Sequence, residues 1–129
     1  MKSERSKARD KADKYFSDYV RQRDADENGM VRCCTCNKPM HWKASHNGHF
    51  QSRRYDSTRF DEHNCGVQCP GCNTFNQGEQ FKFALYLDKR YGSGTAEKIT
   101  IKSRMLSRRN RYDYQCIAEE YKNKLKKLK

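Results

Sequence analysis

Two cysteine pairs mark the sequence, Cys33-Cys34-Thr35-Cys36 and Cys69-Pro70-Gly71-Cys72. Each has the C-x2-C spacing that places two thiolates on one metal ion, and two such pairs supply the four ligands of a closed tetrahedral zinc site. We therefore predict that one structural Zn2+ is bound by Cys33, Cys36, Cys69 and Cys72. The alternative is a site in which His41 or His46 replaces one of these cysteines.

The cysteine count also indicates the redox state of the thiols. The chain has seven cysteines, an odd number, and residues 1–13 contain no apolar core of a secretory signal. These features favour reduced, metal-binding thiols over disulfides. The three cysteines outside the pairs are predicted to be small buried residues: Cys34, Cys65 and Cys116.

Length and composition predict a single domain with a small core. The chain has 129 residues, of which 34% are hydrophobic and 34% are charged, and a domain typically has about 100 to 150 residues. The aromatic residues, 12% of the chain, and a metal staple would make up for the low apolar content. No apolar run approaches the roughly 18 residues of a membrane span, so we expect a soluble, cytoplasmic protein without a membrane partner.

The net charge favours a polyanionic partner. Lys and Arg total 28 against 16 acidic residues, a net charge of +12, and such an excess favours nucleic acid through phosphate contacts. The alternative is a basic surface that keeps the protein soluble. Residues 102–129 hold ten basic and three acidic side chains. We predict that this segment contacts the DNA backbone through Arg108, Arg109 and Arg111; the alternative is a solvated helix face.

Hydrophobic periodicity predicts the elements of the first half. Residues 4–23 have the pattern of an amphipathic helix. Residues 24–29 are predicted to form a turn, and residues 30–32 a short strand that leads into the first cysteine pair. Residues 41–50 are predicted to form a hairpin or an irregular strand pair that ends at His49.

The second half is predicted to be mainly helical. A polar loop over residues 51–63 precedes a helical pattern over residues 70–91, which stops at a glycine-rich turn. Residues 95–108 are predicted to form a further helix, although residues 99–101 have the composition of a strand. Residues 112–129 keep helical spacing of their apolar side chains.

A zinc bound by four cysteines has no open coordination position, so it builds structure and any chemistry must lie elsewhere. Phosphodiester hydrolysis is helped by a base, by a divalent cation that neutralises charge, and by cationic side chains that position the strand. Between the cysteine pairs lie His49, Arg53 and Arg54, and Asn73 directly follows the second pair. The segment therefore holds candidates for all three tasks.

Each candidate has a simpler structural alternative. An imidazole with a pKa of about 6.5 suits a general base near neutral pH, and we predict this role for His49; the alternative is a histidine packed on the zinc site. A carboxamide oxygen suits Mg2+ or Mn2+, and we predict that Asn73 is such a ligand; the alternative is a helix cap. Arg53 and Arg54 are predicted phosphate contacts, or else exposed loop charges.

At these residues the chain resembles the HNH, or His-Me finger, nucleases. More closely, it is similar to the phage lambda NinG (Rap) recombination protein family from about residue 10 to residue 97. The similar stretches are Asp10 to Ser17 (DKADKYFS), Gly48-His49-Phe50, Arg59-Phe60-Asp61-Glu62, Asn64-Cys65 and Cys69 to Asn73. The resemblance implies a structure-specific endonuclease that cleaves branched recombination intermediates, such as Holliday junctions and D-loops, encoded by a phage or prophage in a bacterial host.

The resemblance also implies a fold and a role for each residue. The fold would be α+β: a small zinc-stapled ββα-metal core over residues 25–92, an N-terminal helix over residues 1–24 and a basic helical segment over residues 93–129, all in one domain. The HNH pattern makes His49 the general base, Asn64 the residue that holds the loop and orients that base, and Asn73 a ligand of the catalytic metal.

The chain departs from the HNH pattern at one position. Many HNH enzymes have an Asp or His ligand immediately before the base, where this chain has Gly48. The vacancy would be filled by one of four groups: His46, Asn47, Asp61 or a water molecule. The metal shell is therefore the part of the site that the sequence leaves open.

Two functions of different classes fit these observations. The first is a metal-dependent DNA endonuclease that uses Mg2+ or Mn2+. The second is a non-catalytic zinc-ribbon protein that binds DNA as a recombination accessory factor. A zinc-stabilised protein-interaction adaptor fits the charge poorly. A homodimer would suit the cutting of two strands of a symmetric junction, although nothing in the pattern requires one.

Overall fold

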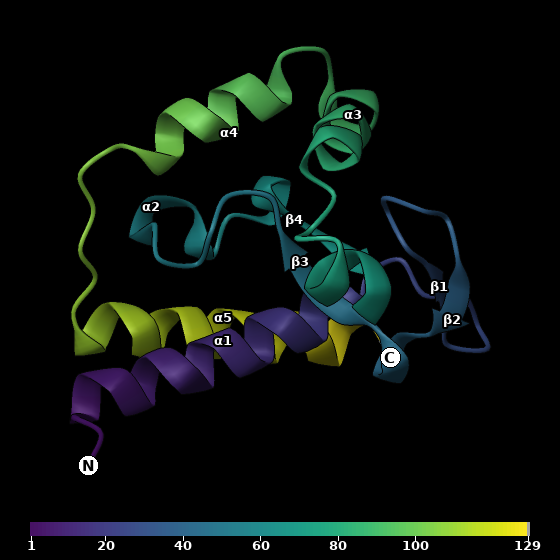
Figure 1. The fold of residues 1–129 in the computed structure, drawn as a ribbon. Coiled ribbons are helices and arrows are strands. Elements are labelled where there is room, and N and C mark those ends of the chain that lie inside the picture. The colour runs from purple at the N-terminus through teal and green to yellow at the C-terminus, as the bar shows by residue number, and fades with distance from the viewer. Residues whose placement is uncertain (129) are drawn as a thin grey trace.

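Helices and short strands alternate along the computed structural model, which describes residues 1–128. This mixture confirms the predicted α+β class. Two long helices, α1 (Glu4–Gln22) and α5 (Arg111–Lys127), lie side by side, while α3 (Gln80–Tyr91) and α4 (Thr95–Ser103) cover the opposite side (Figure 1). The central strands lie between these two helical layers.

The α1–α5 layer follows from caps and an apolar stripe on each helix. Helix α1 begins after Ser3, whose hydroxyl accepts a hydrogen bond from the Ser6 amide at 3.1 Å. Helix α5 begins with a capping box between Asn110 and Asp113, which satisfies two backbone amides at the helix start. The two stripes form one buried cluster: Ala12, Phe16 and Val20 from α1, with Tyr114, Ala118 and Tyr121 from α5. Residues 111–127 are therefore a packed helix with one exposed, lysine-bearing face.

The strands form two antiparallel pairs within residues 1–128. Strand β1 (Met30–Arg32) pairs with β2 (Pro39–His41) around the first cysteine pair. Strand β3 (His46–His49) pairs with β4 (Cys65–Gln68), so that His49 lies opposite Cys65. The predicted hairpin over residues 41–50 is therefore wrong, because a 3-10 turn, Trp42–Ala44, separates two strands that have different partners.

Short helical turns fill the segments around β4. Helix α2 (Asp56–Arg59) and a 3-10 turn (Glu62–Asn64) lie in the stretch predicted to be a loop. A π-helical turn, Gly71–Phe75, includes Cys72 of the second cysteine pair and precedes α3. The strand alternative for residues 99–101 is wrong, because α4 includes them and ends at Ser103.

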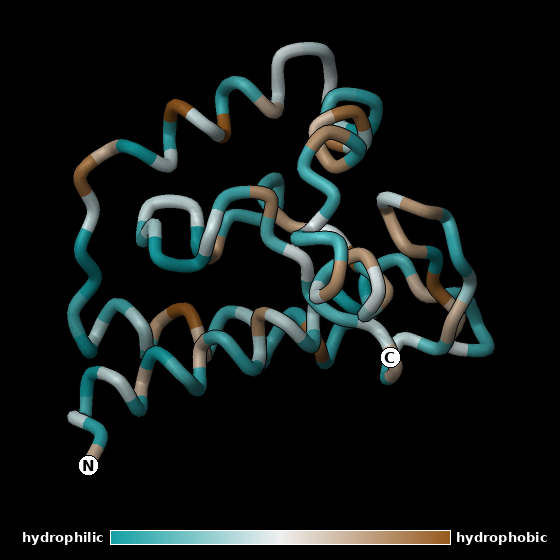
Figure 2. Tube along the Cα trace, in the orientation of Figure 1, coloured by the Kyte–Doolittle hydropathy of each residue, from teal (hydrophilic) through white to brown (hydrophobic). Residues whose placement is uncertain are grey.

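The β3–β4 pair has an apolar cluster on each side. Phe60 and Cys65 join the α1–α5 cluster on one side. On the other side a second cluster contains Phe50, Phe83, Leu87, Ala96 and Ile99. Hydrophilic residues predominate along the rest of the trace (Figure 2), and no helix in the described part of the chain is long and apolar enough to cross a membrane. The core thus fixes β3 and β4 between two helical layers.

Candidate functional site

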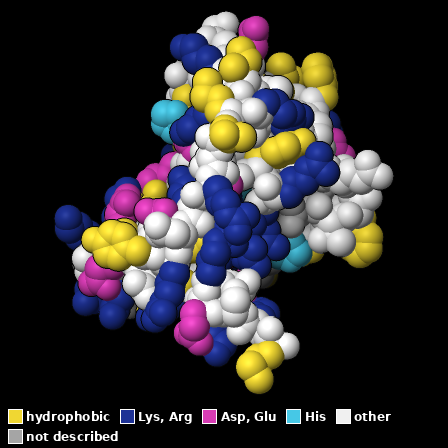
Figure 3. Space-filling model, turned by 90° about the vertical axis from the view of Figure 1, so that its left-hand side faces the viewer, with side chains coloured by type: hydrophobic (Ala, Val, Ile, Leu, Met, Phe, Trp, Pro, Cys, Tyr) yellow, Lys and Arg dark blue, Asp and Glu magenta, His cyan; other side chains and the backbone are white. Residues whose placement is uncertain are grey.

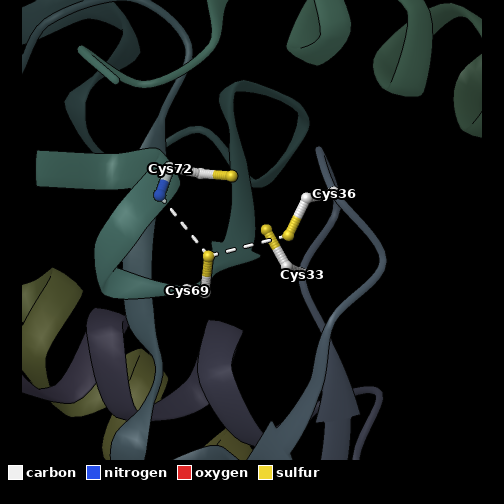
Figure 4. Close-up of side chains that lie close together, drawn as sticks. All are labelled: Cys33, Cys36, Cys69 and Cys72. Atoms are coloured by element: carbon white, nitrogen blue, oxygen red, sulfur yellow. Dashed lines mark hydrogen bonds between the residues drawn. The ribbon is translucent and has the colours of Figure 1, made fainter. Parts of the chain in front are cut away.

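The four predicted zinc ligands come together in the structure. The sulfur atoms of Cys33, Cys36, Cys69 and Cys72 all lie within 4.8 Å of one another, and Figure 4 shows them converging from the loop after β1 and from the start of the π-helical turn after β4. Zinc–sulfur bonds of about 2.3 Å in a tetrahedron place the sulfurs about 3.8 Å apart. The Sγ atoms of Cys36 and Cys69 are 3.7 Å apart. The cluster therefore has the ligands and the spacing of a structural zinc site.

Local hydrogen bonds favour the thiolate form of one cysteine in this cluster. The Cys72 amide donates to Cys69 Sγ at 3.4 Å, and the Thr35 hydroxyl lies 3.3 Å from Cys33 Sγ. Burial raises the pKa of Cys33, but hydrogen bonds from Thr35 and from backbone amides lower it to about 6. Burial and the neighbouring cysteines raise the pKa of Cys72 to about 12, so a bound metal would itself stabilise the thiolate form that binds zinc. His41 and His46 lie outside the cluster.

The remaining cysteines differ in exposure. Cys65 is fully buried and Cys34 is half-buried, as small apolar residues would be, but Cys116 is exposed on α5. The prediction that Cys116 is buried is wrong, because it lies on the face of α5 that points away from α1.

Gln68 connects the zinc site to the strand that carries His49. Its buried side chain donates to the Thr35 hydroxyl at 3.1 Å and to the Gly78 carbonyl at 2.9 Å. A Cβ atom on Gly48 would lie 2.2 Å from Gln68 Oε1. An Asp or His at position 48 would therefore collide with this anchored side chain.

His49 ends β3 and is held by one hydrogen bond. Its Nε2 lies 3.0 Å from the Arg59 carbonyl oxygen. Because a carbonyl only accepts, Nε2 carries the proton and Nδ1 carries the free lone pair in the neutral ring. Burial lowers the pKa of His49 to about 4, and the positive charge of Arg53 adds to this effect. The imidazole is therefore neutral at pH 7, with Nδ1 as its basic atom.

An ion pair fixes the residue that holds His49. The Arg59 guanidinium donates to both carboxylate oxygens of Asp13, at 3.0 Å and 2.6 Å. This fork geometry is the strong, oriented form of the pair. Asp13 lies on α1, so the N-terminal helix positions the Arg59 backbone and, through its carbonyl, the His49 ring.

Asn64 is completely buried and holds the loop that follows His49. Its Oδ1 accepts from the Gln51 amide at 2.7 Å, and its Nδ2 donates to the Gln51 and Thr58 carbonyls at 3.0 and 3.1 Å. These bonds tie together the two ends of residues 51–58. The contacts are those of a loop-holding residue, and its influence on the base stays a prediction.

Asn73 contacts His46, one of the four groups predicted for the vacancy at Gly48. Its Nδ2 is 3.0 Å from His46 Nδ1, and both side chains are half-buried. Among the four candidates for the vacancy, His46 therefore lies next to the predicted ligand Asn73. Asp61 lies elsewhere: its carboxylate caps a 3-10 turn and pairs with Lys102 at 2.6 Å.

One open pocket of about 570 Å³ brings these side chains together. Asp13, His46, Asn47, His49, Arg53 and Asn73 are among the residues that line it. Asn47 Oδ1 is buried and has no hydrogen-bond partner among residues 1–128. The pocket thus combines the neutral imidazole of His49, the side-chain amides of Asn47 and Asn73, and the positively charged guanidinium of Arg53.

Comparison with known proteins identifies the family of this chain. A family model described as "Bacteriophage Lambda NinG protein" matches residues 1–129. The chain belongs to the NinG family. No curated protein and no solved structure matches it. The family match confirms the closer of the two resemblances seen in the sequence.

The predicted DNA-contacting arginines of this NinG chain occupy different environments. Arg53, Arg54, Arg108 and Arg111 are exposed, and Arg53 lines the pocket of His49. Arg109 instead turns inward: its guanidinium pairs with Asp56 at 3.3 Å and lies 5.4 Å from the centre of the Phe60 ring. Arg109 therefore holds the α4–α5 linker against α2.

Two residues around the pocket, Asp13 and Arg59, had no role predicted from the sequence. Asp13 and Arg59 lie in the DKADKYFS and Arg59-Phe60-Asp61-Glu62 stretches that resemble NinG, so the resemblance contained a signal for them. His46 was one of four groups predicted for the vacancy at Gly48, and its separation of three residues from His49 gave no reason to prefer it over the others. The π-helical turn that brings Asn73 to His46 supplies that reason.

Proposed function

We propose that this NinG protein is a metal-dependent endonuclease of the His-Me finger type that cleaves branched DNA, with His49 as general base. The observation that carries the proposal is the single pocket that holds the neutral His49 ring beside the His46–Asn73 pair and Arg53. The order of two antiparallel strands followed by a helical turn, β3, β4 and Gly71–Phe75, is the order that a ββα-metal core requires.

His49 would take the proton of the attacking water. The Arg59 carbonyl accepts the hydrogen bond of His49 Nε2–H, so the Nδ1 lone pair is left to accept the water proton. The low pKa keeps that lone pair free at neutral pH. General-base assistance of this kind contributes about 10²- to 10⁴-fold to a rate.

The residues around Asn73 fit a divalent cation. Two neighbouring ligands of an octahedral ion, each about 2.1 Å from it, are about 3.0 Å apart. Asn73 Nδ2 and His46 Nδ1 have this separation. A half-turn of the Asn73 amide would put its oxygen, a metal ligand, in the place of Nδ2. His46 thus takes the ligand position that Gly48 leaves vacant. A bound cation would neutralise charge on the scissile phosphate and leaving oxygen, and an imidazole ligand favours Mn2+ over Mg2+.

The cationic side chains of the pocket would position the substrate. Arg21, Lys43 and Arg53 line it with His49, and phosphate contacts of this kind fix the register of a nucleic acid without reading its sequence. Preference for a branched substrate rests on membership of the NinG family, and a homodimer and a cytoplasmic location in a bacterial host remain predictions.

Cleavage of a labelled four-way junction, compared with a linear duplex of the same sequence, tests this function. We expect the parent protein to cut the junction only with an added divalent cation and faster with Mn2+ than with Mg2+. His46→Ala and Asn73→Ala should each need at least about tenfold more Mn2+ for half-maximal cutting, whereas Asn76→Ala, an exposed control, should not. If the parent protein binds the junction but fails to cut it with every divalent cation tested, it is instead the accessory DNA-binding protein.

A further inference from the structure

A second basic pocket lies next to the one that contains His49. It has a volume of about 370 Å³, and six arginines are among the described residues that line it. They come from helix α1, from the loop after β3, from α2 and from the α4–α5 linker: Arg5, Arg9, Arg53, Arg54, Arg59 and Arg108. Figure 3 shows the face that lies on the left-hand side in Figure 1, with Lys and Arg side chains gathered in one patch near its middle.

The carboxylates around this pocket leave it positively charged. Asp13 pairs with Arg59 at 2.6 Å and lies 3.9 Å from Arg53. Asp56, which also lines the pocket, is occupied by Arg109 and by the Ser107 hydroxyl at 2.6 Å. Arg9 has its nearest described carboxylate, Asp10, at 4.0 Å, and its buried Nε lacks a hydrogen-bond partner within residues 1–128. Arg108 is exposed in the linker. Guanidinium groups with free N–H edges match the oxygens of a phosphate in fork geometry.

Two residues connect this pocket with the candidate catalytic centre. Arg53 lines both the arginine pocket and the pocket of His49. Arg54 lines the arginine pocket and a further hollow that His49 and Asn73 also line. A strand whose phosphate lies beside His49 would therefore continue past Arg53 into the arginine pocket.

We propose that the arginine pocket binds the DNA backbone beside the scissile phosphate, so that helix α1 is part of the DNA-binding surface. The position of the strand rests on the proposed function of the His49 pocket. Arg9 and Arg108 are the residues that identify this contact, because they lie outside the candidate catalytic pocket and approach the arginine pocket from opposite ends of the sequence.

The salt dependence of DNA binding tests this inference. The probe is a fluorescently labelled four-way junction, titrated by anisotropy at several salt concentrations without divalent cations, so that no cleavage occurs. The double variant Arg9→Gln/Arg108→Gln removes two positive charges from the pocket. The matched control, Lys89→Gln/Lys98→Gln, removes two exposed charges from α3 and α4.

We expect the slope of log affinity against log salt to become shallower by about 2 in the arginine variant, about 1 for each lost phosphate contact. Between 50 and 200 mM salt, the affinity of the parent would then fall about 15-fold more than that of the variant. The control should keep the slope of the parent. Arg108→Gln alone, in the exposed linker, should change the slope by about 1 and serves if the double variant does not fold.

An unchanged slope in the arginine variants, or an equal change in the lysine control, would overturn the inference. The two proposals can fail separately. A parent that binds the junction and never cuts it refutes the nuclease, while the slopes still decide whether the arginine pocket contacts DNA. A parent that cuts the junction, with a variant of unchanged slope, refutes the arginine pocket alone.

Discussion

At the scale of the residue, His49 is positioned from a distance. Asp13 on α1 orients the Arg59 guanidinium, and the Arg59 carbonyl accepts the hydrogen bond of His49 Nε2. This connection decides which ring nitrogen is basic. A residue of the N-terminal helix, far from His49 in sequence, therefore contributes to the chemistry available in the pocket.

The protonation of His49 follows from its burial. Burial lowers the pKa of His49 to about 4, so we expect an NMR titration, assigned with His49→Ala, to show a neutral ring protonated at Nε2 down to about pH 5. A midpoint near 6.5 would contradict the buried geometry. The unfolded chain takes up this proton near pH 6.5. Between pH 6.5 and 4 the unfolded state therefore binds more protons, and His49 contributes a loss of stability as the pH falls.

At the scale of the element, the α1–α5 pair supports the pocket from one side. Phe16 of α1 packs on both Phe60 and Tyr121, with ring centres 5.6 and 4.9 Å apart, and lies 6.3 Å from the His49 ring. Glu62, next to the loop that Asn64 holds, accepts from Tyr121 and Lys124 of α5 at 2.8 and 3.0 Å. The C-terminal helix thus stabilises the fold around the candidate site.

The start of α5 gives a test of this support. Asn110→Ala removes the acceptor for the Asp113 amide, which now lies 2.9 Å away, and loss of such a cap costs about 1 kcal/mol. We expect the free energy of unfolding, measured by urea titration, to fall by about that amount. Asn123→Ala, at an exposed position within the same helix, is the control. Equal stability of the two variants would show that the capping box contributes nothing.

The sequence predicted local elements better than distant pairings. The helices over residues 4–22 and 80–91 follow from apolar spacing and end signals, which are local. The partner of β3 is not a local property, because β4 lies beyond two helical turns. The cysteine site also joins distant segments, but it was predicted because the ligand chemistry of two C-x2-C pairs indicates their pairing, whereas His46 beside Asn73 required the π-helical turn and the β3–β4 register.

At the scale of the whole molecule, the cysteine cluster joins the β1–β2 hairpin to the end of β4. The cluster has its own small buried core, Cys33, Cys69 and Cys72 with Met40 packed against it. Through Thr35 and Gln68 it also contacts the strand that carries His49. Loss of the metal should therefore disturb the candidate catalytic pocket as well as the hairpin.

Removal of one ligand tests the metal site. Cys69→Ser should lose the zinc that we expect at one ion per chain, and it should lose the cooperative thermal unfolding transition, because binding energy at such sites is folding energy. Zinc content by atomic absorption and unfolding by circular dichroism measure the two effects. Cys116→Ser, at the exposed cysteine of α5, should keep both. Zinc retained in full by Cys69→Ser would contradict the four-cysteine site.

The most direct test of the whole account is the single-turnover rate of four-way junction cleavage with Mn2+. The parent, His49→Ala and His63→Ala are compared at equal, saturating protein concentration. His63 is an exposed histidine stacked on Tyr91 at 4.1 Å, and it serves as the control. We predict that His49→Ala binds the junction as the parent does and cuts at least about 100-fold more slowly, while His63→Ala stays within about twofold. Cutting by His49→Ala at the rate of the parent would contradict the account.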